Sequence, residues 1–247
     1  ALAGDNVTER GDNLDWYSGP TLMQHLEEVQ IDEADQALPF RLPVQWVNRP
    51  NLDFRGFCGQ IAGGTVRVGD KIKAMPSAKQ STVKSIVTMD GELDEAVAGQ
   101  SITLTLNDEI DISRGDLICK SDHPAEIGNQ FEAQVIWMAD ETMFPGRTYL
   151  LKCGTTNAQA TLATPKYKID VNTMVHEATR NLELNEIGIC NISLDRYIPF
   201  DPYADNRETG SFILIDRLTN ATVGMGMLHF ALRRSANVHW QATEVHK

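Results

Sequence analysis

The chain has 247 residues, 42% of them hydrophobic and 23% charged, a composition typical of globular proteins with room for two compact domains. No apolar run approaches the roughly 18 residues of a membrane-spanning helix, and the first residues lack the basic and apolar regions of a signal peptide. We therefore expect a cytoplasmic protein with no membrane partner. The formal net charge of -12 counts against a nucleic-acid-binding surface, which needs clustered lysine and arginine.

The negative charge is concentrated at the beginning of the chain. Residues 1–38 contain nine acidic residues and one arginine, which is nine minus one, or a net charge of -8. A polar loop over residues 1–15 is expected to lead into a helix that Pro20 opens, with Leu22, Leu26 and Val29 on one apolar face. An acidic linker follows over residues 30–38. A solvated helix and linker is the favoured interpretation, and a docking surface for a basic partner is the alternative.

A first block of short strands begins near residue 39. Gly63 and Gly64 predict a tight hairpin, because glycine accepts positive φ, and Gly69 with Asp70 predicts a turn. Many short strands separated by close turns, with almost no helical period, indicate an antiparallel barrel or sandwich. The predicted strands cover residues 41–48, 57–61, 65–68, 71–74, 81–89, 101–106 and 116–120.

A second strand-rich block covers residues 131–230. Pro145-Gly146 and other turn signals separate its apolar runs, and residues 177–185 form a polar connector without a strong period. Residues 218–220 predict the turn of a closing hairpin. The predicted strands of this block cover residues 131–138, 148–153, 158–169, 188–194 and 210–217.

The sequence contains no arrangement that predicts catalysis or metal binding. A phosphate-binding G-x-x-x-x-G-K-[ST] loop is absent, as are the D-x-x-G and N-K-x-D motifs, so this chain alone is not expected to bind GTP. The cysteines at 58, 119, 153 and 190 form no C-x-x-C pair, which favours buried reduced thiols over zinc or disulfides. Asp108, Glu109, Asp111 and Asp116 depart from the spacing of a calcium loop. The scattered histidines accompany no nucleophile motif.

One loop is unusually rich in side chains that form hydrogen bonds. Asn48, Arg49, Asn51, Asp53 and Arg55 occupy a proline-containing segment that a simple turn would not require. A self-bonded Asx-type loop, with Asp53 paired to Arg55 or Arg49, is one interpretation. A recognition loop is the other, because arginine offers a planar fork of donors suited to carboxylates at an interface.

Several segments of the sequence resemble segments of one family of GTPases. The run RGFCGQIAGGTVRVGDKI at 55–72 resembles the second domain of translation-factor-type GTPases such as elongation factor Tu, and residues 208–228 resemble the final hairpin of their third domain. The words NRPNLDFRG at 48–56 and DEIDISRGD at 108–116 resemble the large, GTPase subunit of bacterial sulfate adenylyltransferase. Residues 1–6 resemble the end of the segment that helps hold guanine in these GTPases.

The resemblance implies an all-β fold of two consecutive antiparallel β-barrels preceded by one short helix. It assigns residues 1–38 to the end of a GTP-binding domain and its linker, 39–127 and 128–232 to barrels of the domain 2 and domain 3 types, and 233–247 to a tail. The apolar helix face would then lie partly unburied in this chain. The GTP-binding domain itself is expected to be missing from the sequence.

In that family a small subunit transfers the adenylyl group of ATP to sulfate, and the large subunit hydrolyses GTP to drive the reaction. The resemblance implies a regulatory and docking role, with the small catalytic subunit, the chain's own GTP-binding domain and an adenylylsulfate kinase domain after Lys247 as partners. No cofactor is expected in this fragment, whereas GTP and Mg²⁺ are expected in the full-length subunit. The alternative is a pair of translation-factor barrels that hold RNA, against which the acidic charge counts.

Overall fold

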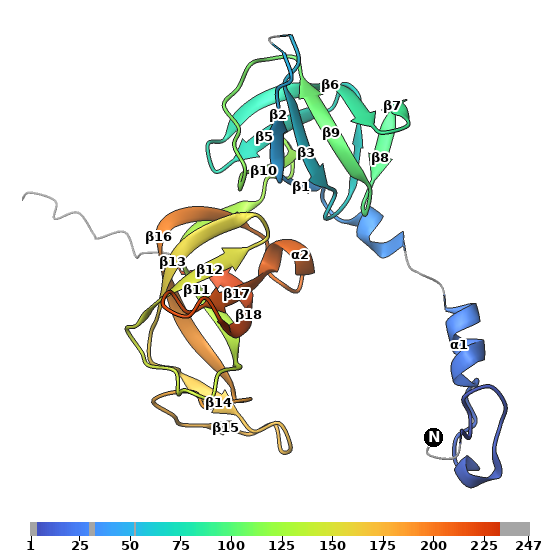
Figure 1. The fold of residues 1–247 in the computed structure, drawn as a ribbon, viewed down its shortest axis with the longest axis vertical. Coiled ribbons are helices and arrows are strands. Elements are labelled where there is room, and N and C mark those ends of the chain that lie inside the picture. The colour runs from blue at the N-terminus through green and yellow to red at the C-terminus, as the bar shows by residue number, and fades with distance from the viewer. Residues whose placement is uncertain (1–3, 30–32, 52, 233–247) are drawn as a thin grey trace, which may run out of the picture. The chain divides into compact units, whose positions relative to one another are not determined.

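The structure, a computed structural model, describes residues 4–29, 33–51 and 53–232 (Figure 1). The chain divides into two compact units between Ala34 and Asp35, and we describe each unit by itself. None of the helices within the described ranges is long and apolar enough to cross a membrane. The predominance of strands confirms the all-β class predicted from the sequence.

The first unit contains a 3-10 turn, η1 (Asp12–Leu14), and one α-helix, α1 (Leu22–Glu28). The prediction that Pro20 opens the helix was wrong by two positions, because a capping box fixes the start. The Thr21 hydroxyl accepts a hydrogen bond from the Gln24 backbone N–H at 3.2 Å, and the Gln24 side chain accepts one from the Thr21 N–H at 3.1 Å. These bonds satisfy amide groups that the first helical turn leaves unpaired.

The apolar side of α1 lies exposed within its unit. Leu22, Leu26 and Val29 are 51%, 58% and 46% exposed, so the apolar face predicted from the sequence exists and nothing in this unit covers it. A seven-residue helix is marginal in water without such cover.

A 3-10 helix, η2 (Glu33–Ala37), spans the boundary of the two units, where the sequence had predicted only a linker. Ten short strands follow, two of which, β7 and β8, the sequence reading missed. They are β1 (Arg41–Pro43), β2 (Trp46–Asn48), β3 (Gly56–Gln60), β4 (Thr65–Arg67), β5 (Lys71–Met75), β6 (Lys79–Thr88), β7 (Gly91–Leu93), β8 (Glu95–Val97), β9 (Ser101–Leu106) and β10 (Leu117–Lys120).

These strands curl into a barrel with the order β1-β10-β5-β6-β9-β3-β2. The ring closes where β1 meets the residues after β3, since the Arg41 N–H donates to the Gly63 carbonyl at 2.9 Å and the Ala62 N–H donates to the Arg41 carbonyl at 2.8 Å. The core is formed by inward-facing side chains such as Leu42, Ile72 and Leu104, which are fully buried.

The hairpin predicted at Gly63 and Gly64 was wrong. Strand β3 pairs with β2 and β9, and β4 pairs with β8 in a separate two-stranded sheet. The two glycines serve close backbone packing instead: Gly64 has a φ of 73°, and a Cβ atom there would lie 2.5 Å from the Phe40 nitrogen. The turn predicted at Gly69 is confirmed, with a φ of 91°.

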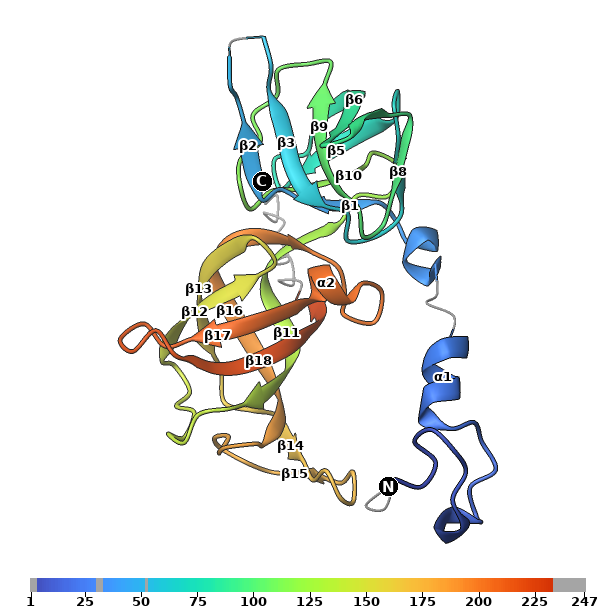
Figure 2. The same cartoon turned by 45° about the vertical axis from the view of Figure 1, so that its right-hand side comes forward.

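The second barrel is a closed ring of six strands in the order β11-β18-β17-β12-β13-β16, completed by pairing of β11 with β16 (Figure 2). Alternate residues of β11, such as Phe131, Val135 and Trp137, fill its core. Its strands are β11 (Glu126–Trp137), β12 (Thr148–Cys153), β13 (Thr156–Leu162), β14 (Tyr167–Ile169), β15 (His176–Glu177), β16 (Ile187–Phe200), β17 (Ser211–Ile215) and β18 (Thr222–Ala231).

Three details of the second barrel differ from the predicted strands. The strand predicted over residues 158–169 is interrupted near Pro165 and forms β13 and β14. Strand β16 continues to Phe200, beyond its predicted end at residue 194. A four-residue helix, α2 (Arg207–Gly210), precedes β17 and was not predicted, because the Asn206 cap that starts it resembles an ordinary turn residue in sequence.

The role of Gly64 is testable by substitution. We expect Gly64→Ala to destabilise the chain by about 3 kcal/mol, because the new Cβ adds a clash with backbone atoms to the strain of positive φ. Gly69→Ala is the matched control: it has positive φ and nothing within 4 Å, so we expect a loss of about 1 kcal/mol. Urea unfolding measures both, and equal losses would contradict the packing role.

Candidate functional site

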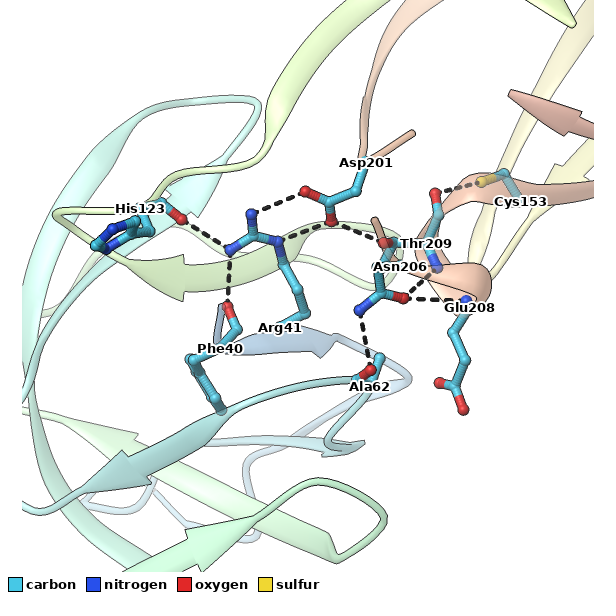
Figure 3. Close-up of polar contacts among 9 residues, drawn as sticks. All are labelled: Phe40, Arg41, Ala62, His123, Cys153, Asp201, Asn206, Glu208 and Thr209. Atoms are coloured by element: carbon cyan, nitrogen blue, oxygen red, sulfur yellow. Dashed lines mark hydrogen bonds and ion pairs between the residues drawn. The ribbon is translucent and has the colours of Figure 1, made fainter. Parts of the chain in front are cut away.

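A buried ion pair joins the two barrels. The Arg41 guanidinium on β1 donates from Nε and Nη2 to the two carboxylate oxygens of Asp201, each at 2.8 Å (Figure 3). The side chains of Arg41 and Asp201 are only 5% and 12% exposed. The Nη1 group donates to the carbonyls of Phe40 at 3.0 Å and His123 at 2.7 Å, so four of the five N–H groups of the guanidinium are bonded.

The polypeptide after β16 supplies further bonds at the same junction. The Thr209 hydroxyl donates to Asp201 at 2.7 Å. The Asn206 side chain accepts from the backbone N–H groups of Glu208 and Thr209, which caps α2, and donates to the carbonyl of Ala62 in the first barrel at 3.0 Å. One asparagine thus fixes both the local turn and its contact with the neighbouring barrel.

The environment of the junction shifts the pKa values of its ionisable groups. Burial alone would lower the pKa of Arg41, but hydrogen bonds to Asp201 outweigh it and the pKa is raised. Burial raises the pKa of Cys119, which lies beside Arg41. Burial and the nearby charge of Asp35 raise the pKa of Glu208. Burial thus disfavours the charged forms of Cys119 and Glu208, and the raised pKa of Cys119 is the opposite of what an activated thiol nucleophile needs.

The polar loop identified in the sequence lies at one end of the first barrel, and it is partly self-bonded. The Asn51 side chain accepts hydrogen bonds from the backbone N–H groups of Asp53 at 3.0 Å and Phe54 at 2.9 Å. This confirms the Asx-type turn. Asn48 ends β2, which places the loop directly after a barrel strand.

The ion pairs of this loop are not those predicted. Arg49 and Arg55 pair across the barrel end with Glu109 at 4.0 Å and Asp111 at 3.6 Å, instead of with Asp53. The two acids are 79% and 80% exposed, so these contacts are weak and remain accessible to a partner. The segments 48–56 and 108–116, which carried the family resemblance, are therefore neighbours in space. Their separation in sequence gave no sign of this contact.

A polar cavity of about 350 Å³ lies beside this loop. Asp53, Arg55, Lys84 and Glu109 line it with charges of both signs, and the Arg55 guanidinium stacks over the Phe57 ring at 5.4 Å. A wall of mixed charge suits contact with a polar protein surface better than enclosure of a single anion.

A second, apolar cavity of about 520 Å³ lies on the outside of the second barrel. Ile136, Ile213 and Met225 meet there from adjacent strands, and Met225 is 41% exposed. The sequence did not predict this surface. The alternation of side chains along β17 and β18 predicts which residues face outward, but it does not predict that the outward apolar side chains of neighbouring strands lie side by side. Outward apolar clusters of this kind are typical of interaction surfaces.

Metal-binding and redox chemistry find little support in the described part of the chain. Within it, no three histidine, cysteine, aspartate or glutamate side chains converge as metal ligands would. The cysteines are all free: Cys58 is half-buried, and the other three are buried. Burial raises the pKa of Cys153 and Cys190 to about 12, which makes these thiols unreactive at neutral pH.

The fold and these sites define a class, the paired barrels of translation-factor-type GTPases. The family model for elongation factor Tu domain 2 matches residues 58–119, and the GTP-eEF1A C-terminal domain-like model matches residues 130–229. The chain also superposes on sup35 complexed with GDP, with a TM-score of 0.75 at 20% identity, over 94% of this chain and 57% of that one. This likeness establishes the fold.

Curated relatives narrow the class. The chain is 52% identical over its whole length to the "Bifunctional enzyme NodQ" of Rhizobium sp. (strain N33), covering 38% of it. It is 50% identical over 96% of its length to "Sulfate adenylyltransferase subunit 1" of Teredinibacter turnerae, covering 50% of that protein. It is 48% identical over 99% of its length to the "Bifunctional enzyme CysN/CysC" of Xylella fastidiosa, covering 39% of it.

The chain is therefore similar over nearly its whole length to part of proteins named sulfate adenylyltransferase subunit 1, NodQ and CysN/CysC, and it has the two domain types of elongation-factor-Tu-like proteins. It spans half or less of the length of these relatives.

Breaking the junction pair should reveal its energetic importance. We expect Arg41→Ala to destabilise the chain by about 3 to 5 kcal/mol, because Asp201 keeps a buried charge without its partner. The double variant Arg41→Ala with Asp201→Ala should cost less than the sum of the two single changes. Urea unfolding of the four proteins measures this.

Arg67→Ala is the control for this experiment, since Arg67 pairs with Glu95 at an exposed position of the same barrel. It should change stability little, because exposed ion pairs contribute little. Equal effects of Arg41→Ala and Arg67→Ala would contradict the importance of the buried pair.

Proposed function

We propose that this chain is the regulatory and docking part of the GTPase subunit of sulfate adenylyltransferase. In this proposal a GTP-binding domain of the same subunit binds GTP and Mg²⁺, and a small subunit forms adenylylsulfate and pyrophosphate from ATP and sulfate. The two barrels transmit the nucleotide state of the GTP-binding domain to the small subunit. The observation that carries the proposal is the identity of about half of the residues, over 96% of the chain, to proteins named sulfate adenylyltransferase subunit 1.

The buried junction supports a mechanical role. A bidentate pair between Arg41 and Asp201 needs one orientation of both groups, because a planar guanidinium and a carboxylate lose their hydrogen bonds when they rotate apart. The Asn206 bond to Ala62 adds a second constraint. Barrels held at two such points would move together, so a contact made by one barrel affects the position of the other.

Two uncovered apolar surfaces support the presence of further domains in the working protein. The α1 face has Leu26 58% exposed, and the outer face of the second barrel includes Met225 at 41%. Surfaces of this kind are costly to leave in water. We assign them to contacts with the GTP-binding domain of the same subunit.

The loop from Asn48 to Arg55 is proposed as a contact within the same assembly, with the small subunit or with the GTP-binding domain. Its arginines are held by exposed acids, which a partner's carboxylates could replace at little cost. Arginine is also enriched at protein interfaces. An adenylylsulfate kinase domain after Lys247 remains part of the proposal for relatives of the bifunctional type.

The loop assignment is tested in the full-length large subunit with the double variant Arg49→Ala and Arg55→Ala. We expect at least a tenfold loss in either the affinity for the small subunit or the GTP-dependent stimulation of adenylylsulfate formation. The reason is that the partner's carboxylates lose the two arginine side chains that would bind them. Arg67→Ala, which removes an exposed arginine from β4 of the same barrel, is the control and should change neither quantity.

Two outcomes would contradict the proposal. If the double variant matches the wild type in both assays and in thermal stability, the loop is only a structural turn. If the wild-type subunit forms no complex with the small subunit but the chain binds RNA in a salt-sensitive manner, the barrels belong to a translation factor instead.

A further inference from the structure

The hairpin formed by β14 and β15 extends beyond the six-strand ring of the second barrel (Figures 1 and 2). It is attached through β14, whose residues Tyr167 to Ile169 pair with β16. Strand β15 pairs only with β14 among the described strands. The residues between the two strands, 170–175, form a tip that contributes nothing to either barrel core.

The tip is apolar although it is surrounded by solvent. Val171, Met174 and Val175 are 60%, 70% and 56% exposed, so half of its six residues present aliphatic or thioether groups to water. Other hairpins of the barrels expose single large apolar residues, such as Met89 and Leu218. A cluster at a projecting tip is unusual for a surface that stays in water.

The tip is nevertheless held in one conformation. Asp170 accepts hydrogen bonds from the backbone N–H groups of Asn172 at 2.7 Å and Thr173 at 3.2 Å, and its carbonyl accepts from Met174 at 2.7 Å. At the base of the hairpin, the rings of Tyr167 and His176 stack with centroids 4.0 Å apart. Lys168 bonds Glu186, the residue before β16, and lies 3.8 Å from Glu177 on β15.

Met174 has a φ of 59°, in the left-handed region that residues with bulky side chains rarely adopt. Asparagine or glycine would occupy this position without such strain. Methionine at this position therefore carries backbone strain that asparagine or glycine would avoid. Strained residues of this kind concentrate at binding sites.

We propose that the tip formed by residues 170–175 is a docking finger that inserts Val171, Met174 and Val175 into an apolar pocket with a basic rim on the small subunit. The inference rests on the proposed function for the identity of that subunit. Apolar side chains on a preorganised turn lose little conformational freedom on binding, and methionine adapts to the shape of a pocket. Asp170 at the tip supplies negative charge that a basic rim would complement, whereas Glu177 at the base shares the positive charge of Lys168.

The test uses the full-length large subunit and the small subunit. The double variant Val171→Thr with Met174→Asn makes two of the three apolar side chains of the tip polar. Threonine has nearly the volume of valine, and asparagine suits the left-handed region at position 174. We expect its affinity for the small subunit, measured by isothermal titration calorimetry, to fall at least tenfold, with an unchanged melting temperature.

Leu218→Asn is the matched control. Leu218 is 86% exposed on the hairpin between β17 and β18 of the same barrel, so its substitution removes a similar apolar group from a different tip. It should leave the affinity unchanged. Oxidative footprinting gives an independent measurement: Met174 should be protected several-fold in the complex, whereas Met89, fully exposed on the first barrel, should not be.

The outcomes separate this inference from the proposed function. Two results together would overturn the docking finger and leave the proposed function standing. The double variant would bind the small subunit with the affinity of the wild type, and Met174 of the wild-type complex would oxidise as fast as in the free subunit. A wild-type subunit that does not bind the small subunit at all would overturn both. An equal loss in the double variant and in Leu218→Asn would show a general effect of surface polarity and would also overturn the inference.

Discussion

The pair of Arg41 and Asp201 is the interaction on which the arrangement of the two barrels depends. Each barrel has its own core, so the cores alone do not fix one barrel against the other. A buried charge must find its partner and all of its hydrogen bonds, or the cost is several kcal/mol. The four donor bonds of the Arg41 fork and the Thr209 bond to Asp201 meet this requirement in the observed geometry. The pair thereby contributes orientation more than it contributes stability.

A fixed pair of barrels gives the remaining surface features a common purpose. The loop from Asn48 to Arg55 and the finger at residues 170–175 are both preorganised by an asparagine or aspartate side chain that accepts backbone N–H groups. Side chains on such supports keep their positions relative to the barrel that carries them. In the proposed assembly, a rigid body with several docking points would carry a change at one partner to another without any change inside the barrels. This account needs no catalytic group in the chain itself.

The sequence predicted the barrels better than it predicted what joins them. The alternation of Ile102 and Leu104 with threonines predicted β9 at its observed bounds, because the period of a strand is local information. Arg41 and Asp201 are 160 residues apart, and no spacing rule connects them. Gly63 and Gly64 were misassigned because a glycine pair has the same signature in a hairpin as in close backbone packing. The acids at 109 and 111 were weighed as metal ligands, and only the fold placed them opposite Arg49 and Arg55.

The most direct test of the rigid junction is a distance distribution between spin labels at positions 89 and 218, measured by double electron-electron resonance. Both residues are strongly exposed, one on each barrel, so the labels should leave the cores intact. The account predicts one narrow distribution in the wild-type chain and a broad one after Arg41→Met, which keeps the volume of the side chain but removes its charge. A broad distribution in the wild type, or one that Arg41→Met leaves unchanged, would contradict the claim that this buried pair holds the barrels as a single body.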